Sequence, residues 1–204
     1  MKEITKMLLI ENFDQCYQFG VKLKDFLTEE QIKLKIEFCS EIINRNTIEN
    51  VSEFYIGLWN VLFSINEEEW ENLLKDYWDK SFIQPYLFSI LWRTNRYFNE
   101  FRWNKFKELF ESRQIKPVRL IDAIQHKDLP PSVSINDKRI LLVETIRYIG
   151  EMIEGEVRYP IDFYFSFIWR LENLLSRDEE LLNEDLAEIF LDHNREIWRE
   201  REVE

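Results

Sequence analysis

Two hexapeptides of nearly the same sequence, FSILWR at positions 88–93 and FSFIWR at positions 165–170, lie in segments that are apolar on almost every side. A helix that is apolar all round is stable only where protein or lipid surrounds it. We therefore expect residues 82–98 and 161–175 to form two central helices that are buried in the fold.

Glycine and proline are scarce: the chain has 4 Gly and 5 Pro in 204 residues. So few interruptions favour long helices joined by short links. The 16 Phe, 8 Tyr and 7 Trp supply enough large side chains for a sizeable core. The sequence therefore predicts an all-α fold, a multi-helix bundle or helical-repeat-like domain of about 8–10 helices.

Capping signatures mark several helix starts. Thr28 and Gln31 are spaced as a capping box. Asn66 precedes three glutamates, which are favourable at the positive end of a helix, and Asn136 precedes an aspartate. Together with apolar residues at helical spacing, these signals predict helices over residues 14–27, 28–43, 51–64, 66–78, 82–98, 101–112, 118–125, 140–153, 161–175 and from 184 onward.

The clearest break is the segment 127–133, in which two adjacent prolines forbid a helix. We expect residues 1–204 to form a single α-helical domain, whose candidate subassemblies 1–126 and 134–204 are joined by this loop.

The two candidate subassemblies share an order of elements. In each, a helix, a link, an aromatic helix and a further helix follow one another, with Pro85 and Pro160 in corresponding places. Duplication of two similar halves is one interpretation, and two unrelated core helices in an aromatic-rich chain is the other. Ser89 and Ser166 are small, and we expect them to let the two aromatic helices cross closely.

The net charge of −12 makes the chain a poor non-specific binder of nucleic acid, because phosphates repel it. An acidic chain suits a basic protein partner. Cys16 and Cys39 are the only cysteines, and without a signal peptide we expect them to be reduced and buried in a cytoplasmic protein. No apolar run approaches the roughly 20 residues of a membrane helix.

Catalytic and cofactor motifs are scarce. His126 and His193 are the only histidines, the cysteines form no Cys-x-x-Cys pair, and no glycine-rich phosphate loop is present. We expect no enzyme activity, no cofactor and no metal. One exception runs over eight residues: Arg119 and His126 are spaced as Arg-x6-His, which resembles the Arg-x4-6-His signature of the HEPN ribonuclease families. That resemblance implies that the Arg and His of two protomers act on RNA.

Charge is unevenly distributed. Residues 93–119 hold eight basic and three acidic residues with aromatic residues interleaved, a pattern that can bind single-stranded nucleic acid. The alternative is an amphipathic helix with buried rings and solvated charges. Residues 177–204 hold eleven acidic residues and four arginines, and they could dock on a basic protein, lie over the basic segment or form a solvated face.

The sequence-based hypothesis is therefore a non-catalytic protein-binding protein. We expect a small acidic bacterial inhibitor or accessory subunit that acts on a larger partner, of the toxin-immunity, phage-defence or anti-defence type. The two alternatives are the HEPN-like ribonuclease and a nucleic-acid-binding module that uses residues 93–119. The candidate partner-binding residues are Arg93, Arg96, Arg102, Lys105, Arg170, Glu179, Glu180, Glu184, Asp185, Glu188 and Asp192.

Overall fold

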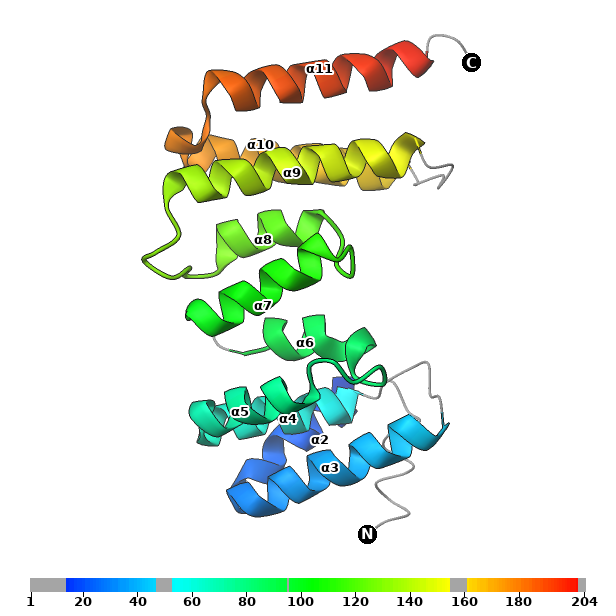
Figure 1. Ribbon diagram of the computed structural model, residues 1–204, viewed down its shortest axis with the longest axis vertical. Coiled ribbons are helices and arrows are strands. Elements are labelled where there is room, and N and C mark those ends of the chain that lie inside the picture. The colour runs from blue at the N-terminus through cyan, green and yellow to red at the C-terminus, as the bar shows by residue number, and fades with distance from the viewer. Residues whose placement is uncertain (1–13, 47–52, 95, 155–160, 202–204) are drawn as a thin grey trace. The chain divides into compact units, whose positions relative to one another are not determined.

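The computed structural model describes residues 14–46, 53–94, 96–154 and 161–201, and this part of the chain is all-α, as predicted. It contains ten α-helices and no β-strand (Figure 1). The chain divides into two compact units, Met1–Asn95 and Arg96–Glu204. The 127–133 loop lies inside the second unit, where it connects α8 to α9, so the predicted subassemblies 1–126 and 134–204 do not coincide with this division.

The helices of the first unit are α2 (Asp14–Lys22), α3 (Glu29–Asn46), α4 (Glu53–Ile65), α5 (Glu67–Tyr77) and α6 (Leu87–Trp92), with 3-10 turns at Leu23–Asp25 and Gln84–Tyr86. Those of the second unit are α7 (Glu100–Glu111), α8 (Val118–His126), α9 (Ile135–Glu154), α10 (Ile161–Arg177) and α11 (Glu184–Arg201), with a 3-10 turn at Glu179–Leu181.

Helix α4 is the centre of the first unit. It packs against α2, α3, α5 and α6, and every residue from position 54 to 59 is buried. The rings of Tyr55, Trp59 and Tyr77 meet edge to face, with centroid distances of 6.2 Å and 5.9 Å along the chain of contacts. The Tyr55 hydroxyl and the Ser40 hydroxyl lie 2.7 Å apart and link α4 to α3. The helix that is surrounded on all sides in this unit is therefore α4.

The predicted central helix over 82–98 is wrong. Pro85 lies in a 3-10 turn, and α6 then runs for only six residues. The Thr94 hydroxyl donates to the Leu91 carbonyl at 2.8 Å, and the Asn60 side-chain amide donates to the Arg93 carbonyl. These side chains bind carbonyls at the end of α6. Their hydrogen bonds replace the backbone hydrogen bonds that a longer helix would make there.

The prediction that residues 161–175 form a helix buried on all sides is also wrong. Helix α10 is amphipathic: Phe167, Leu171 and Leu174 form one buried stripe. Phe165 and Trp169 lie on another face and are 46% and 64% exposed. Ser166, also exposed, is not at a helix crossing.

Among the described helices, α2 and α4 make a close crossing instead, where Gly20 and Gly57 bring the two backbones together.

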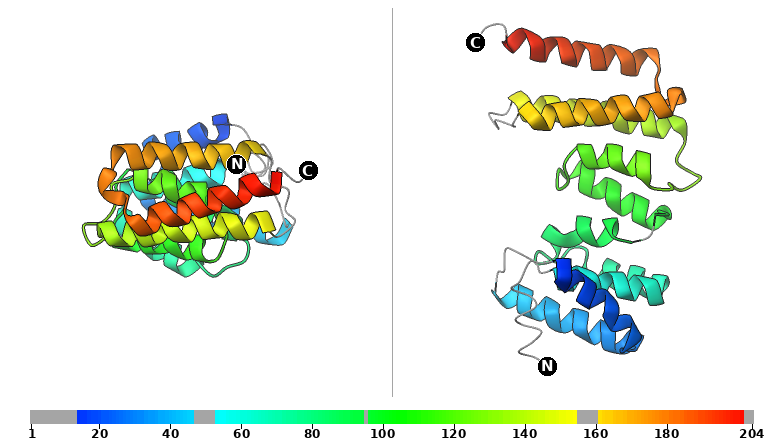
Figure 2. Two further views of the ribbon diagram at one scale, coloured as in Figure 1. Left: turned by 90° about the horizontal axis from the view of Figure 1, so that it is seen from above. Right: turned by 180° about the vertical axis from the view of Figure 1, so that it is seen from behind.

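The second unit is assembled around α8 and α9. Helix α8 packs against both α9 and α10, and α11 lies along α9 (Figures 1 and 2). The Arg139 guanidinium donates to the carbonyls of Glu180 and Leu181 and so ties the turn before α11 to α9.

Most helix starts agree with the capping signals. Gln31 donates its N–H to the Thr28 hydroxyl at 3.4 Å, and the Thr28 N–H donates to the Gln31 side chain at 3.0 Å. Asn66 accepts the N–H of Glu69 at 3.1 Å. At α9 the capping residue is Ser134, paired with Asp137, rather than the predicted Asn136.

Both cysteines are free and buried, as predicted. Burial raises the pKa of the Cys39 thiol to about 12. Among the described helices, none is long and apolar enough to cross a membrane.

Candidate functional site

Arg93, at the end of α6, is held by its own unit. Its guanidinium forms an ion pair with Glu53 at the start of α4 and lies over the Tyr17 ring, 4.4 Å from the centroid. These contacts connect α2, α4 and α6. They give Arg93 a structural role, and its predicted partner-binding role stays a prediction.

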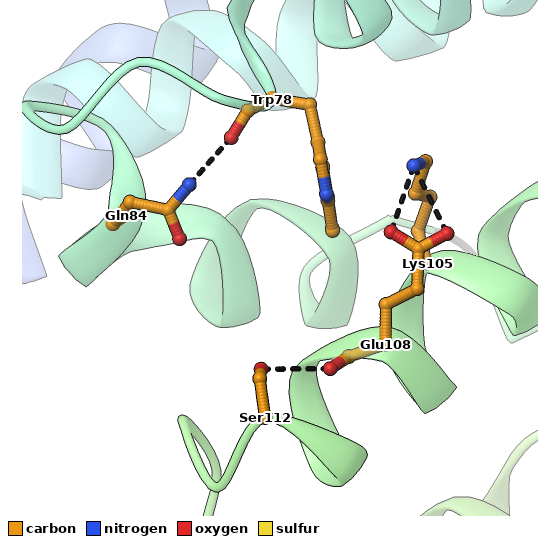
Figure 3. A network of polar contacts seen from close by, with 5 residues as sticks. All are labelled: Trp78, Gln84, Lys105, Glu108 and Ser112. Carbon is orange, nitrogen blue, oxygen red and sulfur yellow. Dashed lines mark hydrogen bonds and ion pairs between the residues drawn. The ribbon is translucent and has the colours of Figure 1, made fainter.

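The basic residues of α7 and of the segment that precedes it also have local partners. Arg96 pairs with Asp128 at 3.3 Å, and Arg102 is fully buried with its Nε donating to Asn99 at 3.4 Å. Lys105 donates to both carboxylate oxygens of Glu108, at 2.8 Å and 3.0 Å (Figure 3). The Glu108 carbonyl in turn accepts from the Ser112 hydroxyl at 2.7 Å (Figure 3).

Most rings of this segment point inward, and the exception is Tyr97, which is 46% exposed. Phe98, Trp103 and Phe106 are buried, and Trp103 stacks on Phe106 with centroids 6.0 Å apart. Rings that stack on bases must be accessible. This arrangement supports the amphipathic-helix interpretation of residues 93–119, and nucleic-acid binding stays a prediction.

Lys127 lies close to the buried Arg102. Its ammonium lies 5.0 Å from the centroid of the Phe98 ring. Burial, reinforced by the positive charge of Arg102, lowers the pKa of Lys127 to about 8. The folded protein therefore binds this proton less strongly than the unfolded chain does.

This lowered pKa predicts a pH dependence of stability. Between pH 8 and the ordinary lysine value near 10.5, the unfolded chain binds a proton that the folded chain lacks, so stability rises with pH. Lys127→Met should stabilise the protein at pH 7, by no more than about 2 kcal/mol after solvent screening. The measurement is urea unfolding of both proteins from pH 7 to 10.5, in which the advantage of the variant should shrink as pH rises. A difference that is constant or grows with pH would contradict the assignment.

Arg119 and His126 lie seven residues apart on α8, on the same side of the helix and about 10 Å apart along its axis. Arg119 pairs with Asp122 at 3.3 Å, and His126 is exposed. No group of three potential metal ligands occurs within the described residues. The ribonuclease hypothesis stays a prediction.

Asp122 links two arginines. Its side chain is 5% exposed and accepts from Arg119 through one oxygen and from Arg170, on α10, through the other. Within the described residues the buried Nε of Arg170 has no hydrogen-bond acceptor. Asp122 therefore binds α10 to α8, and this pair gives Arg170 a structural role; partner binding by Arg170 stays a prediction.

The acidic candidates are placed differently from the basic ones. We call the outward side of α11 over positions 184–192 the acidic face, and all of its acidic side chains are exposed. Leu191 lies among them and is 52% exposed, whereas Leu186 points into the unit and is fully buried. The acidic face consists of Glu184, Asp185, Glu188, Leu191 and Asp192, and Glu179 and Glu180 are exposed in the preceding turn.

Three of the four carboxylates of the acidic face form no ion pair within the described residues. Glu184, Asp185 and Glu188 pair with no basic side chain in the described part of the chain. Glu188 stands four residues from both Glu184 and Asp192, and like charges at this spacing destabilise a helix by about 0.2–0.5 kcal/mol per pair. Helix α11 packs on α9, so the predicted alternative of docking over residues 93–119 is not what the structure shows.

Two surface features were missed in the sequence. One is the exposed pair Phe165 and Trp169 on α10, whose four-residue spacing, offset from the buried stripe, could have indicated a separate face. The other is a cleft between α7 and the start of α9, which depends on tertiary packing and has no sequence signal.

No protein-family model, no curated protein and no solved structure matches this chain.

Proposed function

We propose that this chain is a non-catalytic protein-binding protein and that the acidic face of α11 docks on a basic surface of a larger partner. The observation that carries the proposal is the exposed Leu191 among exposed carboxylates, of which Glu184, Asp185 and Glu188 have no basic partner in the described part of the chain. Protein interfaces combine an apolar centre with a polar rim, and complementary charge guides the two surfaces together.

The contrast between the two charged segments supports the choice of surface. The basic side chains Arg93, Arg96 and Lys105 form ion pairs inside their own units, and Arg102 is buried. A partner that bound them would have to break those contacts. Binding at the acidic face would instead relieve repulsion between Glu184 and Glu188. An inhibitor or accessory subunit of the immunity or defence type would use such a surface to hold a basic partner.

Affinity purification from the native host, read by mass spectrometry, tests this proposal. The double variant Glu188→Lys, Asp192→Lys should reduce capture of the partner at least about tenfold, and wild-type capture should weaken in high salt. The matched control is Asp76→Lys, Asp79→Lys, which changes the net charge equally at exposed positions near the end of α5. It should retain the partner.

The proposal fails if both double variants lose the partner equally, because net charge alone would then explain binding. It also fails if neither variant affects capture, or if the purified chain cleaves RNA in a manner that His126→Ala abolishes.

A further inference from the structure

A cleft of about 270 Å³ in the second unit lies between one side of α7 and the beginning of α9. The α7 residues that line it include positions 100, 103, 107 and 111, which follow one another at helical spacing. The opposite wall is formed by the end of the 127–133 loop and by the first turns of α9.

The charge of the cleft is negative. Glu100, Glu111 and Asp137 contribute three carboxylates, against the single ammonium of Lys107. Two of these carboxylates are fixed: Glu100 is hydrogen-bonded to the Ser132 hydroxyl, and Asp137 accepts from the Ser134 N–H at 2.9 Å and hydroxyl at 2.7 Å. The hydrogen bonds from Ser134, aided by Lys107, hold the pKa of Asp137 below its usual range, so this carboxylate is charged at neutral pH.

Apolar side chains line the cleft as well, together with the polar side chains of Asn104 and Ser132. Of these apolar residues, Ile140 is 53% exposed and Trp103 is buried. A purely polar ligand would leave Ile140 against water, and a purely apolar ligand would remove carboxylates from water without compensation. The ligand that satisfies both has an alkyl stem that ends in a cation.

We propose that this cleft binds the side chain of a lysine that a protein partner presents. The volume is below the roughly 300–1,000 Å³ of pockets for drug-sized molecules, so it suits one side chain. Lysine carries a compact charge on a flexible four-carbon stem, which fits carboxylates that come from different elements better than the flat fork of arginine does. The inference rests on the proposed function only for the source of the lysine, because the cleft is separate from the acidic face.

The test is an NMR titration of the full ¹⁵N-labelled chain with Nα-acetyl-L-lysine N-methylamide. The norleucine derivative has the same four-carbon stem but lacks the ammonium group, and it serves as the reference. Saturable shifts confined to residues that line the cleft are expected with the lysine derivative only. Glu111→Gln should weaken this binding at least about threefold and Lys107→Gln should strengthen it. Both substitutions lie on the surface of α7, and Glu188→Gln on the acidic face should leave binding unchanged.

Three outcomes overturn the proposal. The first is that the norleucine derivative binds as well as the lysine derivative. The second is that Glu111→Gln and Lys107→Gln change the affinity in the same direction. Spermidine is compared in the same titration, and tighter binding of this free polyamine would contradict a protein source. Failure of the acidic-face capture experiment with an intact lysine titration would remove the proposed function and leave the cleft assignment standing.

Discussion

Replacing Asp122 with alanine should lower the free energy of unfolding by about 3 kcal/mol. Asp122 is almost fully buried and binds Arg170 across the α8–α10 interface. Its removal leaves the Arg170 guanidinium, whose Nε already lacks an acceptor within the described residues, without its carboxylate. Breaking a buried ion pair typically costs roughly 3–5 kcal/mol. We expect the lower end, because the Arg170 side chain is 33% exposed and water can screen it in part.

Urea unfolding of a small variant set measures this effect. Arg119→Gln removes only the outer partner of Asp122, whose side chain is 44% exposed, and should cost less than about 1 kcal/mol. The double variant Asp122→Leu, Arg170→Met replaces the ion pair by apolar side chains and should recover most of the stability. If Asp122→Ala and Arg119→Gln cost the same, the α8–α10 pair is not the stabilising contact.

The features that the sequence predicted correctly depend on local chemistry. The capping box at Thr28 and Gln31 and the cap at Asn66 need only residues three positions apart. Helical class follows similarly from the scarcity of glycine and proline and from the spacing of apolar residues. These properties do not require knowledge of which surfaces meet.

Burial and pairing could not be predicted in the same way. Phe165 and Trp169 are as apolar as the core residues of α4, yet their side chains are 46% and 64% exposed. Asp122 and Arg170 are 48 residues apart, and many acidic and basic residues could have been paired in their place. The cleft lies between α7 and the start of α9, which are separated in the sequence by α8 and a loop. Its lining residues therefore come together only when the helices pack.

The acidic face is an intermediate case. The sequence showed the excess of acidic residues in 177–204, but not which of them a partner could reach. Helix α11 packs on α9 and buries Leu186, while Glu184, Glu188 and Leu191 lie on the outside. Because this orientation identifies the exposed acidic residues, substitutions such as Glu188→Lys and Asp192→Lys can be chosen. The composition of the segment alone does not identify them.

Gly57→Ala should destabilise the first unit by about 2 kcal/mol, although alanine is the better helix former. A Cβ atom on Gly57 would lie 2.7 Å from the carbonyl oxygen of Tyr17 and 3.2 Å from the Cα of Gly20. Both neighbours are backbone atoms of α2, so relief requires movement of the whole helix. Overpacking of this kind costs roughly 1–3 kcal/mol, with the upper end expected for backbone contacts. The gain in helix propensity, about 1 kcal/mol, offsets only part of it.

The companion substitution makes the prediction sharper. A Cβ on Gly20 would lie 2.9 Å from the carbonyl oxygen of Phe54, at the same crossing. Once α2 has moved to admit one methyl group, the second costs less, so Gly20→Ala, Gly57→Ala should cost less than the sum of its single variants. Thiol labelling gives a second readout, because the buried Cys16 is on α2. Cys16 should react faster in Gly57→Ala than in the wild-type protein, whereas Cys39 on α3 should stay protected in both. Two results would show that α2 and α4 do not cross as closely as this geometry requires. One is equal labelling of Cys16 in the wild-type protein and in Gly57→Ala, and the other is a higher free energy of unfolding for Gly57→Ala.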